Sequence, residues 1–200
     1  MNAQPTLICI PDISGFTQFM SDVDFELTSK VIPSLLNNII YSNEIGLKVS
    51  EIEGDAVLFY RPGELPPFEQ LVSQCQYFYT AFYEQLSYLR EKYSHSDGAS
   101  KIPKILGLKI ILHFGEEVGL MSIGKNIKLI GEDVIVAHKF LKNNIHIDEY
   151  ILISDKLMAQ YNLEISNDDF HWANVQEDKI KIEHMGQLNF SFINLAPLIP

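Results

Sequence analysis

The stretch that decides the fold of this chain is residues 51–60, EIEGDAVLFY. The apolar run Ala56 to Tyr60 follows a Gly54-Asp55 pair, and residues 46–52 before it also have strand-forming character. Glycine adopts the backbone conformations that tight turns need. The stretch therefore predicts a β-hairpin, with strands over 46–52 and 55–61 and the Asp55 carboxylate at its turn.

A second carboxylate, Asp12, ends another apolar run, residues 6–10. We expect that run to form a strand covered on both faces, with regular pairing stopping at Pro11, which has no backbone donor. Residues 15–20 predict a short helix. Carboxylates are the ligands that Mg²⁺ or Mn²⁺ prefers, so two strand-end aspartates favour a metal site that grips a phosphate chain. The alternative, that both aspartates cap turns or helices, stays open.

The remaining patterns predict an α+β chain. Helices are expected over 24–42, where Pro33 either kinks the helix or marks the start of its second part, and over 68–92, 132–141 and 155–161. Strands are expected over 105–114 and 117–123, as a second hairpin turning at Gly115, and over 149–154, 179–184 and 189–195; residues 93–104 read as a flexible connector. Helices mixed with hairpins favour a ferredoxin-like α+β sandwich, formed by one domain over 1–200 with a C-terminal α-β-β extension.

The composition limits the function classes. The net charge is -11, which disfavours nucleic acids and anionic membranes as partners and means that a polyphosphate ligand needs metal ions. The two cysteines, Cys9 and Cys75, lie in apolar patterns and suggest buried, reduced thiols. No apolar run reaches the ~18 residues of a membrane span, and no signal-peptide pattern opens the chain. The expected location is the cytoplasm.

Three segments together resemble the catalytic domains of class III nucleotidyl (adenylate/guanylate) cyclases. They are residues 12–17 (DISGFT), residues 51–56 (EIEGDA) and residues 108–141, which contain HFGE at 113–116 and IGEDV at 130–134. The resemblance covers about residues 6–195. It implies a ferredoxin-like sandwich that pairs head to tail as a homodimer, with active sites at the interface. The implied reaction converts GTP or ATP to a 3′,5′-cyclic nucleotide and pyrophosphate.

The resemblance also assigns the metal and phosphate positions. It implies that Asp12 and Asp55 hold two Mg²⁺ or Mn²⁺ ions and that the backbone of Ile13 is a further ligand. Backbone amides around Gly15, Phe16 and Thr17, where a helix opens, are suited to cradle phosphates.

The resemblance also implies two base-reading positions, which fall on Glu51 and, for the partner chain, on Lys128. A carboxylate accepts from guanine N1 and N2 and an ammonium donates to O6, so this pair suits guanine better than adenine. The alternative, that the two side chains simply pair with each other or with water, stays open.

The pattern breaks on the helix after Gly131. The family places an asparagine and an arginine there, to orient the ribose and to stabilise charge in the transition state. Those positions fall on Ile135, which cannot form a hydrogen bond, and on Lys139, which keeps the charge but lacks the planar fork of arginine. Two hypotheses follow: a weakly active cyclase, or a catalytically degenerate nucleotide-binding or protein-interaction module with the cyclase fold.

Overall fold

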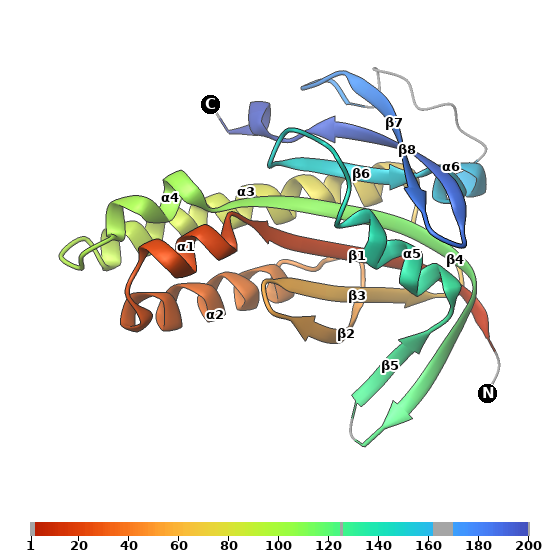
Figure 1. The fold of residues 1–200 in the computed structure, drawn as a ribbon, viewed down its shortest axis with the longest axis horizontal. Helices are drawn as coiled ribbons and strands as arrows, with labels where there is room; N and C mark the ends of the chain where they lie inside the picture. Colours follow the sequence, from red (N-terminus) through yellow and green to blue (C-terminus); the bar gives the residue numbers. More distant parts are fainter. Residues whose placement is uncertain (1–2, 125, 162–169, 200) are drawn as a thin grey trace.

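An eight-stranded sheet forms the centre of the chain, in the order β2-β3-β1-β4-β6-β8-β7, with β5 paired to β4 beside this path (Figure 1). The computed structural model describes residues 3–124, 126–161 and 170–199. The strands are β1 (Gln4–Ser14), β2 (Lys48–Glu53), β3 (Ala56–Pro62), β4 (Gly107–Ile123), β5 (Asn126–Ile130), β6 (Tyr150–Ser154), β7 (Val175–Ile182) and β8 (Gly186–Asn194). The helices are α1 (Phe16–Asp22), α2 (Phe25–Tyr41), α3 (Phe68–Lys92), α4 (Ile102–Ile105), α5 (Glu132–Phe140) and α6 (Asp155–Tyr161), with 3₁₀ turns η1 (Ala99–Lys101) and η3 (Ala196–Leu198).

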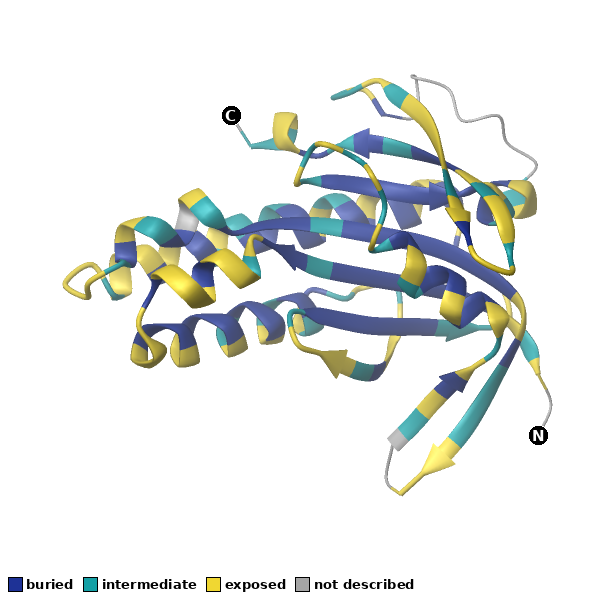
Figure 2. Cartoon of the chain, in the orientation of Figure 1, coloured by how far each residue is buried: buried dark blue, intermediate teal, exposed yellow. Residues whose placement is uncertain are grey.

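Helices cover both faces of the sheet, which explains why its central strands are apolar throughout. Along β1, Leu7 and Cys9 pack into a core with α2 and α3, whereas Ile8 and Ile10 pack into a second core beneath α5. The centres of β1, β3 and β4 are accordingly buried (Figure 2). The predicted α+β sandwich is confirmed, including the C-terminal extension of α6, β7 and β8. Among the described residues, no helix combines the length and apolar character needed to cross a bilayer.

The hairpin predicted to turn at Gly115 is wrong. Residues 107–123 form one continuous strand, β4, and its hairpin partner is β5, with Gly124 at the left-handed φ of 62° where β4 ends. Gly115 serves a close approach instead, because a Cβ there would lie 2.8 Å from the Cβ of Asp133 at the start of α5. The β4–β5 arm extends away from the rest of the sheet (Figure 1).

Pairing does not stop at Pro11, contrary to expectation. The β1–β4 register is continuous from Thr6 through Ser14, whereas the β1–β3 register skips Ile10 and Pro11. The donor that proline lacks is therefore missing on the β3 side only, and the β4 ladder carries the strand onward. This extension places Asp12 inside a strand and not in a loop.

Other boundaries also differ from the predictions. The connector 93–104 contains η1 and the start of α4, because Ile102 is fully buried and anchors the segment on the core. Pro33 lies inside α2, which runs as one helix, so this proline does not mark the start of a second part. Strand β7 begins at Val175, four residues before the predicted strand. The hairpin β2–β3, with Gly54 at φ 64°, and the helix α3 are confirmed.

Substitution of Gly15 by alanine is expected to lower the free energy of unfolding by about 3–5 kcal/mol. Gly15 has a φ of 75°, and a Cβ there would lie 1.9 Å from the carbonyl oxygen of Ile105 at the end of α4. The matched control is Gly46→Ala, at a φ of 72° with no atom within 4 Å of the added Cβ, which should cost only about 1–2 kcal/mol for its backbone conformation. Urea denaturation measures both; equal losses would contradict the close approach of α4.

Candidate active site

The two predicted metal carboxylates lie at the same edge of the sheet. Asp12 is in register with Ala56 on β3, the residue after Asp55. The backbone N–H of Ile13 donates to the carbonyl oxygen of Asp55 at 3.0 Å, which joins the end of β1 to the β2–β3 turn. Burial raises the pKa of Asp12, and the nearby charge of Asp55 raises it further. The sequence prediction that these two aspartates converge therefore agrees with the structure.

A cavity of about 300 Å³ opens beside this pair. Its walls are residues 12–18 at the junction of β1 and α1, Asp55, Lys109, and residues from the segment 141–150 that leads into β6. The hydroxyl of Ser14 donates to the carbonyl oxygen of Asp148 at 2.5 Å, so the two opposite walls are tied together. The predicted phosphate-binding residues Gly15, Phe16 and Thr17 all belong to this lining.

The sequence reasoning missed Lys109. On β4 it is in register with Asp12, and its Nζ lies 3.4 Å from Asp12 Oδ1, with side chains only 20% and 13% exposed. The signal was available, because a lysine interrupts an otherwise apolar strand at residues 106–112. Buried charges are normally paired. Lys109 is therefore a built-in counter-charge for the two carboxylates.

One lysine leaves the two carboxylates short of positive charge. Burial raises the pKa of both Asp12 and Asp55, although Lys109 acts in the opposite direction on each. Two carboxylates with hard oxygen donors suit Mg²⁺ or Mn²⁺. Among the described residues, no three His, Cys, Asp or Glu side chains gather closely enough to hold an ion by themselves. An ion here needs further oxygen ligands, from backbone carbonyls or from a phosphate chain.

The predicted base-reading residues lie outside this cavity. Glu51 on β2 and Lys128 on β5 line a separate groove of about 500 Å³, together with Val49, Ile52, Ile123 and others. Within this single chain, Lys128 Nζ lies 3.3 Å from Glu51 Oε2, so the alternative that the two side chains pair with each other describes the structure. An exposed ion pair of this kind contributes little stability, so a ligand can replace it at small cost.

Ile135 and Lys139 also lie outside the cavity, on the exposed face of α5. Ile135 is 51% exposed, unusual for isoleucine. Between them, His138 contacts two acceptors: Nδ1 lies 2.8 Å from the Val134 carbonyl oxygen and Nε2 lies 3.0 Å from Glu53 Oε2. Both ring nitrogens donate when the ring is an imidazolium facing an ionised carboxylate. This contact ties the β2–β3 hairpin, next to Asp55, to α5.

A second polar network fixes the start of α5 and is structural. His113 Nε2 lies 3.2 Å from Asp133 Oδ1, and His113 Nδ1 lies 2.8 Å from the Ser154 hydroxyl, which accepts from the Leu157 N–H. His113 and Ser154 are each 2% exposed, so no substrate reaches this serine-histidine-aspartate chain. Burial opposes ionisation of Asp133, but His113 and Lys156 outweigh it and lower its pKa to about 2. Its stabilising effect is thus lost only as the pH falls from about 4 towards 2.

Comparison with solved structures identifies the fold. The chain resembles the guanylyl cyclase Cya2, with a TM-score of 0.67 and 16% identity over 96% of this chain and 94% of that one. It resembles the catalytic core of a rhodopsin-guanylyl cyclase with converted specificity, in complex with ATPαS, with a TM-score of 0.64 and 15% identity over 97% of each chain. It also resembles the guanylate cyclase domain of RhGC from Catenaria anguillulae in complex with GTP, with a TM-score of 0.61, 15% identity and coverage of 97% and 98%. The chain therefore has the fold of class III cyclase catalytic domains.

Comparison of sequences gives a different kind of relative. An uncharacterized protein of Mycobacterium tuberculosis is 29% identical over 131 residues, which are 60% of this chain. The match spans 56% of that protein, so this chain corresponds to little more than half of its relative's length. The model of the family described as a protein of unknown function, DUF2652, matches residues 32–150, from α2 to the first residue of β6. More than half of the chain is covered, and the chain belongs to the DUF2652 family.

Proposed function

We propose that this domain binds a nucleoside triphosphate, GTP or ATP, together with Mg²⁺ or Mn²⁺ ions at the Asp12–Asp55 cavity. The observation that carries the proposal is that two carboxylates with too little positive charge beside them lie at one cavity. The 3.0 Å hydrogen bond from the Ile13 N–H to the Asp55 carbonyl oxygen holds them together. Two structures with the same fold are complexes with ATPαS or with GTP, which supports the ligand class. The triphosphate brings the additional oxygen ligands that the ions need.

Each cavity residue has a role in this proposal. Asp12, Asp55 and the carbonyl oxygen of Ile13 hold the two ions. The backbone N–H groups around Gly15, Phe16 and Thr17 donate to phosphate oxygens, because the first N–H groups of a helix have no partner inside it. When bound, the ions neutralise the triphosphate and polarise its phosphorus–oxygen bonds.

Lys109 supplies a further contact to the triphosphate. Its ammonium has three donors, and only Asp12 is within ion-pair distance among the described side chains. It can therefore face a phosphate oxygen without leaving its carboxylate. In the proposed homodimer, Glu51 and Lys128 of the partner chain read the base, guanine in preference to adenine, after the ion pair that these two residues form within each chain opens.

The functional unit in this proposal is a homodimer of single-domain chains, located in the cytoplasm. Exposed isoleucines on neighbouring elements support it: Ile52 on β2, Ile123 on β4, Ile130 on β5 and Ile135 on α5 are each at least 43% exposed. Apolar side chains gathered in this way are typical of a surface that a partner covers. Pairing of two chains would offer the exposed face of α5 to the cavity of the partner.

A second candidate, a nucleotide-binding module without cyclase activity, is favoured by one observation. Ile135 and Lys139 occupy the two positions on the exposed face of α5 that would stabilise the transition state, and of these two side chains only the lysine is charged. Loss of one positioned donor in a transition state typically costs about 10²–10³ in rate. We thus propose that the residues that hold the metal ions and the triphosphate are intact. Turnover to a cyclic nucleotide and pyrophosphate is proposed to be weak.

Thermal unfolding of the purified chain tests binding, and turnover tests the chemistry. Mn²⁺ with GTP, at about 100 times the Kd, should stabilise the fold by about 2.7 kcal/mol and raise Tm by roughly 5–10 °C. Mn²⁺ alone or GTP alone should give much less. Radiolabelled GTP and ATP, incubated under the same conditions, report any cyclic product. No shift with either nucleotide and Mn²⁺ would refute binding and leave a protein-interaction module.

A further inference from the structure

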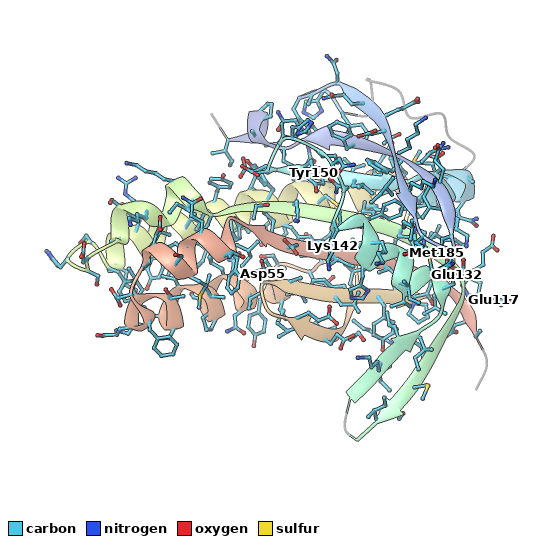
Figure 3. All side chains as sticks on the ribbon, viewed as in Figure 1. Asp55, Glu117, Glu132, Lys142, Tyr150 and Met185 are labelled. Atoms are coloured by element: carbon cyan, nitrogen blue, oxygen red, sulfur yellow. The ribbon has the colours of Figure 1, made fainter. Side chains whose placement is uncertain are left out.

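Tyr150 belongs to the lining of the cavity, at the start of β6. It is the first residue of β6, it is only 3% exposed, and its ring packs edge-on against Phe192 with ring centroids 6.4 Å apart. Figure 3 labels Tyr150 on β6 and Asp55 at the β2–β3 turn. The ring is held in the core that lies beneath α5, so the hydroxyl has a fixed position in the cavity lining.

Among the described residues, none accepts the proton of the Tyr150 hydroxyl. The side-chain amide of Asn143 donates to the Tyr150 oxygen at 2.7 Å and also to the Phe140 carbonyl oxygen at 2.7 Å. The Asn143 oxygen accepts from the Ile145 N–H at 2.8 Å, which fixes the orientation of the amide. The Tyr150 oxygen is thus an acceptor, and in the described part of the chain no hydrogen bond uses its O–H as a donor.

The surroundings keep this hydroxyl protonated. Burial raises the pKa of Tyr150 to about 12; the hydrogen bond from Asn143 acts against this rise, and the charges of Asp12 and Asp148 add to it. A buried donor without an acceptor is costly, and such donors usually mark a position where a ligand or an ordered water supplies the missing acceptor. Because the cavity already holds Asp12, Asp55 and Asp148, a neutral donor can contact an anion without adding charge.

We propose that the Tyr150 hydroxyl donates to a phosphate oxygen of the metal-bound polyphosphate chain, and that Asn143 positions it for this contact. The inference rests on the proposed function, and it adds a phosphate contact from the β6 side of the cavity, outside the residues that the sequence had suggested. The ligand class is a nucleoside triphosphate or free pyrophosphate, because the contact involves the phosphate chain alone. Guanosine lacks phosphates, so its affinity should be the same for the wild type and for Tyr150→Phe.

Titration calorimetry on the full chain with Mn²⁺ tests the contact. Tyr150→Phe removes only the hydroxyl and should raise the Kd of both GTP and pyrophosphate by about 10- to 100-fold, the range for a hydrogen bond to a charged group. Tyr161→Phe is the matched control, because that hydroxyl donates to the Pro66 carbonyl oxygen at 2.8 Å and lies outside the cavity lining. Its Kd values should equal those of the wild type.

The outcomes separate this inference from the proposed function. An unchanged Kd in Tyr150→Phe, or a loss for GTP but not for pyrophosphate, overturns the contact while wild-type binding leaves the proposed function standing. A wild type that binds neither ligand refutes the proposed function and this inference with it. Should Tyr150→Phe not fold, as judged by its unligated Tm, Asn143→Ala frees the hydroxyl from its positioning amide and should weaken the same two ligands by about 3-fold or more; no change for either ligand overturns the proposal.

Discussion

The double substitution Ile135→Asn with Lys139→Arg is expected to raise the rate of cyclic nucleotide formation by about 10²–10³ at saturating GTP and Mn²⁺. Both side chains lie on the exposed face of α5, so the two substitutions should leave the packing of the helix against β4 unchanged. Asparagine adds a hydrogen-bonding group that isoleucine lacks, and arginine replaces a point charge by a planar fork that can bind two phosphate oxygens. The effect should appear in kcat and leave the Kd of GTP almost unchanged, because the added contacts act in the transition state.

The control for this experiment is Lys142→Arg, which changes a lysine to arginine just beyond the end of α5. It should leave turnover at the wild-type level. The assay must be run at protein concentrations where sedimentation shows a dimer, since α5 is proposed to serve the cavity of the partner. Intact GTP binding without any gain in turnover would show that the α5 positions do not face the reacting phosphate.

Asp55→Asn is expected to abolish the Mn²⁺-dependent Tm shift with GTP, with a rise in Kd of more than about 100-fold, because a metal ligand is lost. The same substitution should raise the Tm of the unligated protein at pH 7. Burial raises the pKa of Asp55, so its ionised form is disfavoured in the folded state, and asparagine removes that cost while Asp12 keeps its ion pair with Lys109. A gain in stability with a loss of ligand response is the signature of a functional carboxylate.

The pH dependence provides an independent check of that interpretation. A carboxyl group whose pKa is raised by folding stabilises the protein when protonated, and this stabilisation is lost as the pH rises through the folded-state pKa. The unligated wild type should therefore gain stability as the pH falls from 7 towards about 4, the ordinary pKa of an aspartate, and Asp55→Asn should reduce that gain. Asp148→Asn is the control, because Asp148 lines the same cavity but is exposed to solvent. Asp148→Asn should keep the Tm shift that Mn²⁺ and GTP induce. Loss of that shift in Asp148→Asn as well would show that the assignment of the metal site is wrong.

The sequence could predict features that depend on local patterns. The hairpin around Gly54-Asp55 and the long apolar stripe of α3 follow from turn chemistry and helical periodicity, and both are confirmed. The convergence of Asp12 and Asp55 was predictable because each lies at an end of a strongly apolar strand: Asp12 follows residues 6–10, and Asp55 precedes the run Ala56 to Tyr60. Their further roles with metal and nucleotide stay predictions.

Features that depend on long-range contacts could not be predicted from local patterns. Gly115 looked like a turn residue, but a glycine is needed there because Asp133 of α5 approaches the strand closely. Pro11 looked like the end of a strand, but the donor it lacks is needed only on one side. Lys109 and Tyr150 reach the cavity because β4 lies beside β1 in the sheet and β6 lies beside β4, an order that no local pattern encodes. Gly54 and Gly115 thus lie in similar sequence patterns, but Gly54 forms a turn and Gly115 allows a close approach of α5.

The unbroken course of β4 has a mechanical consequence. One strand carries Lys109 in the cavity and, about 45 Å further along, Ile123 at the end of the projecting arm. A molecule that bound the arm and changed the twist of this strand as far as Lys109 would also move the ammonium group beside Asp12. Thermodynamic reciprocity then requires that occupation of the cavity alters affinity at the arm by the same factor. The arm is therefore a place where an input from another protein can reach the cavity without touching it.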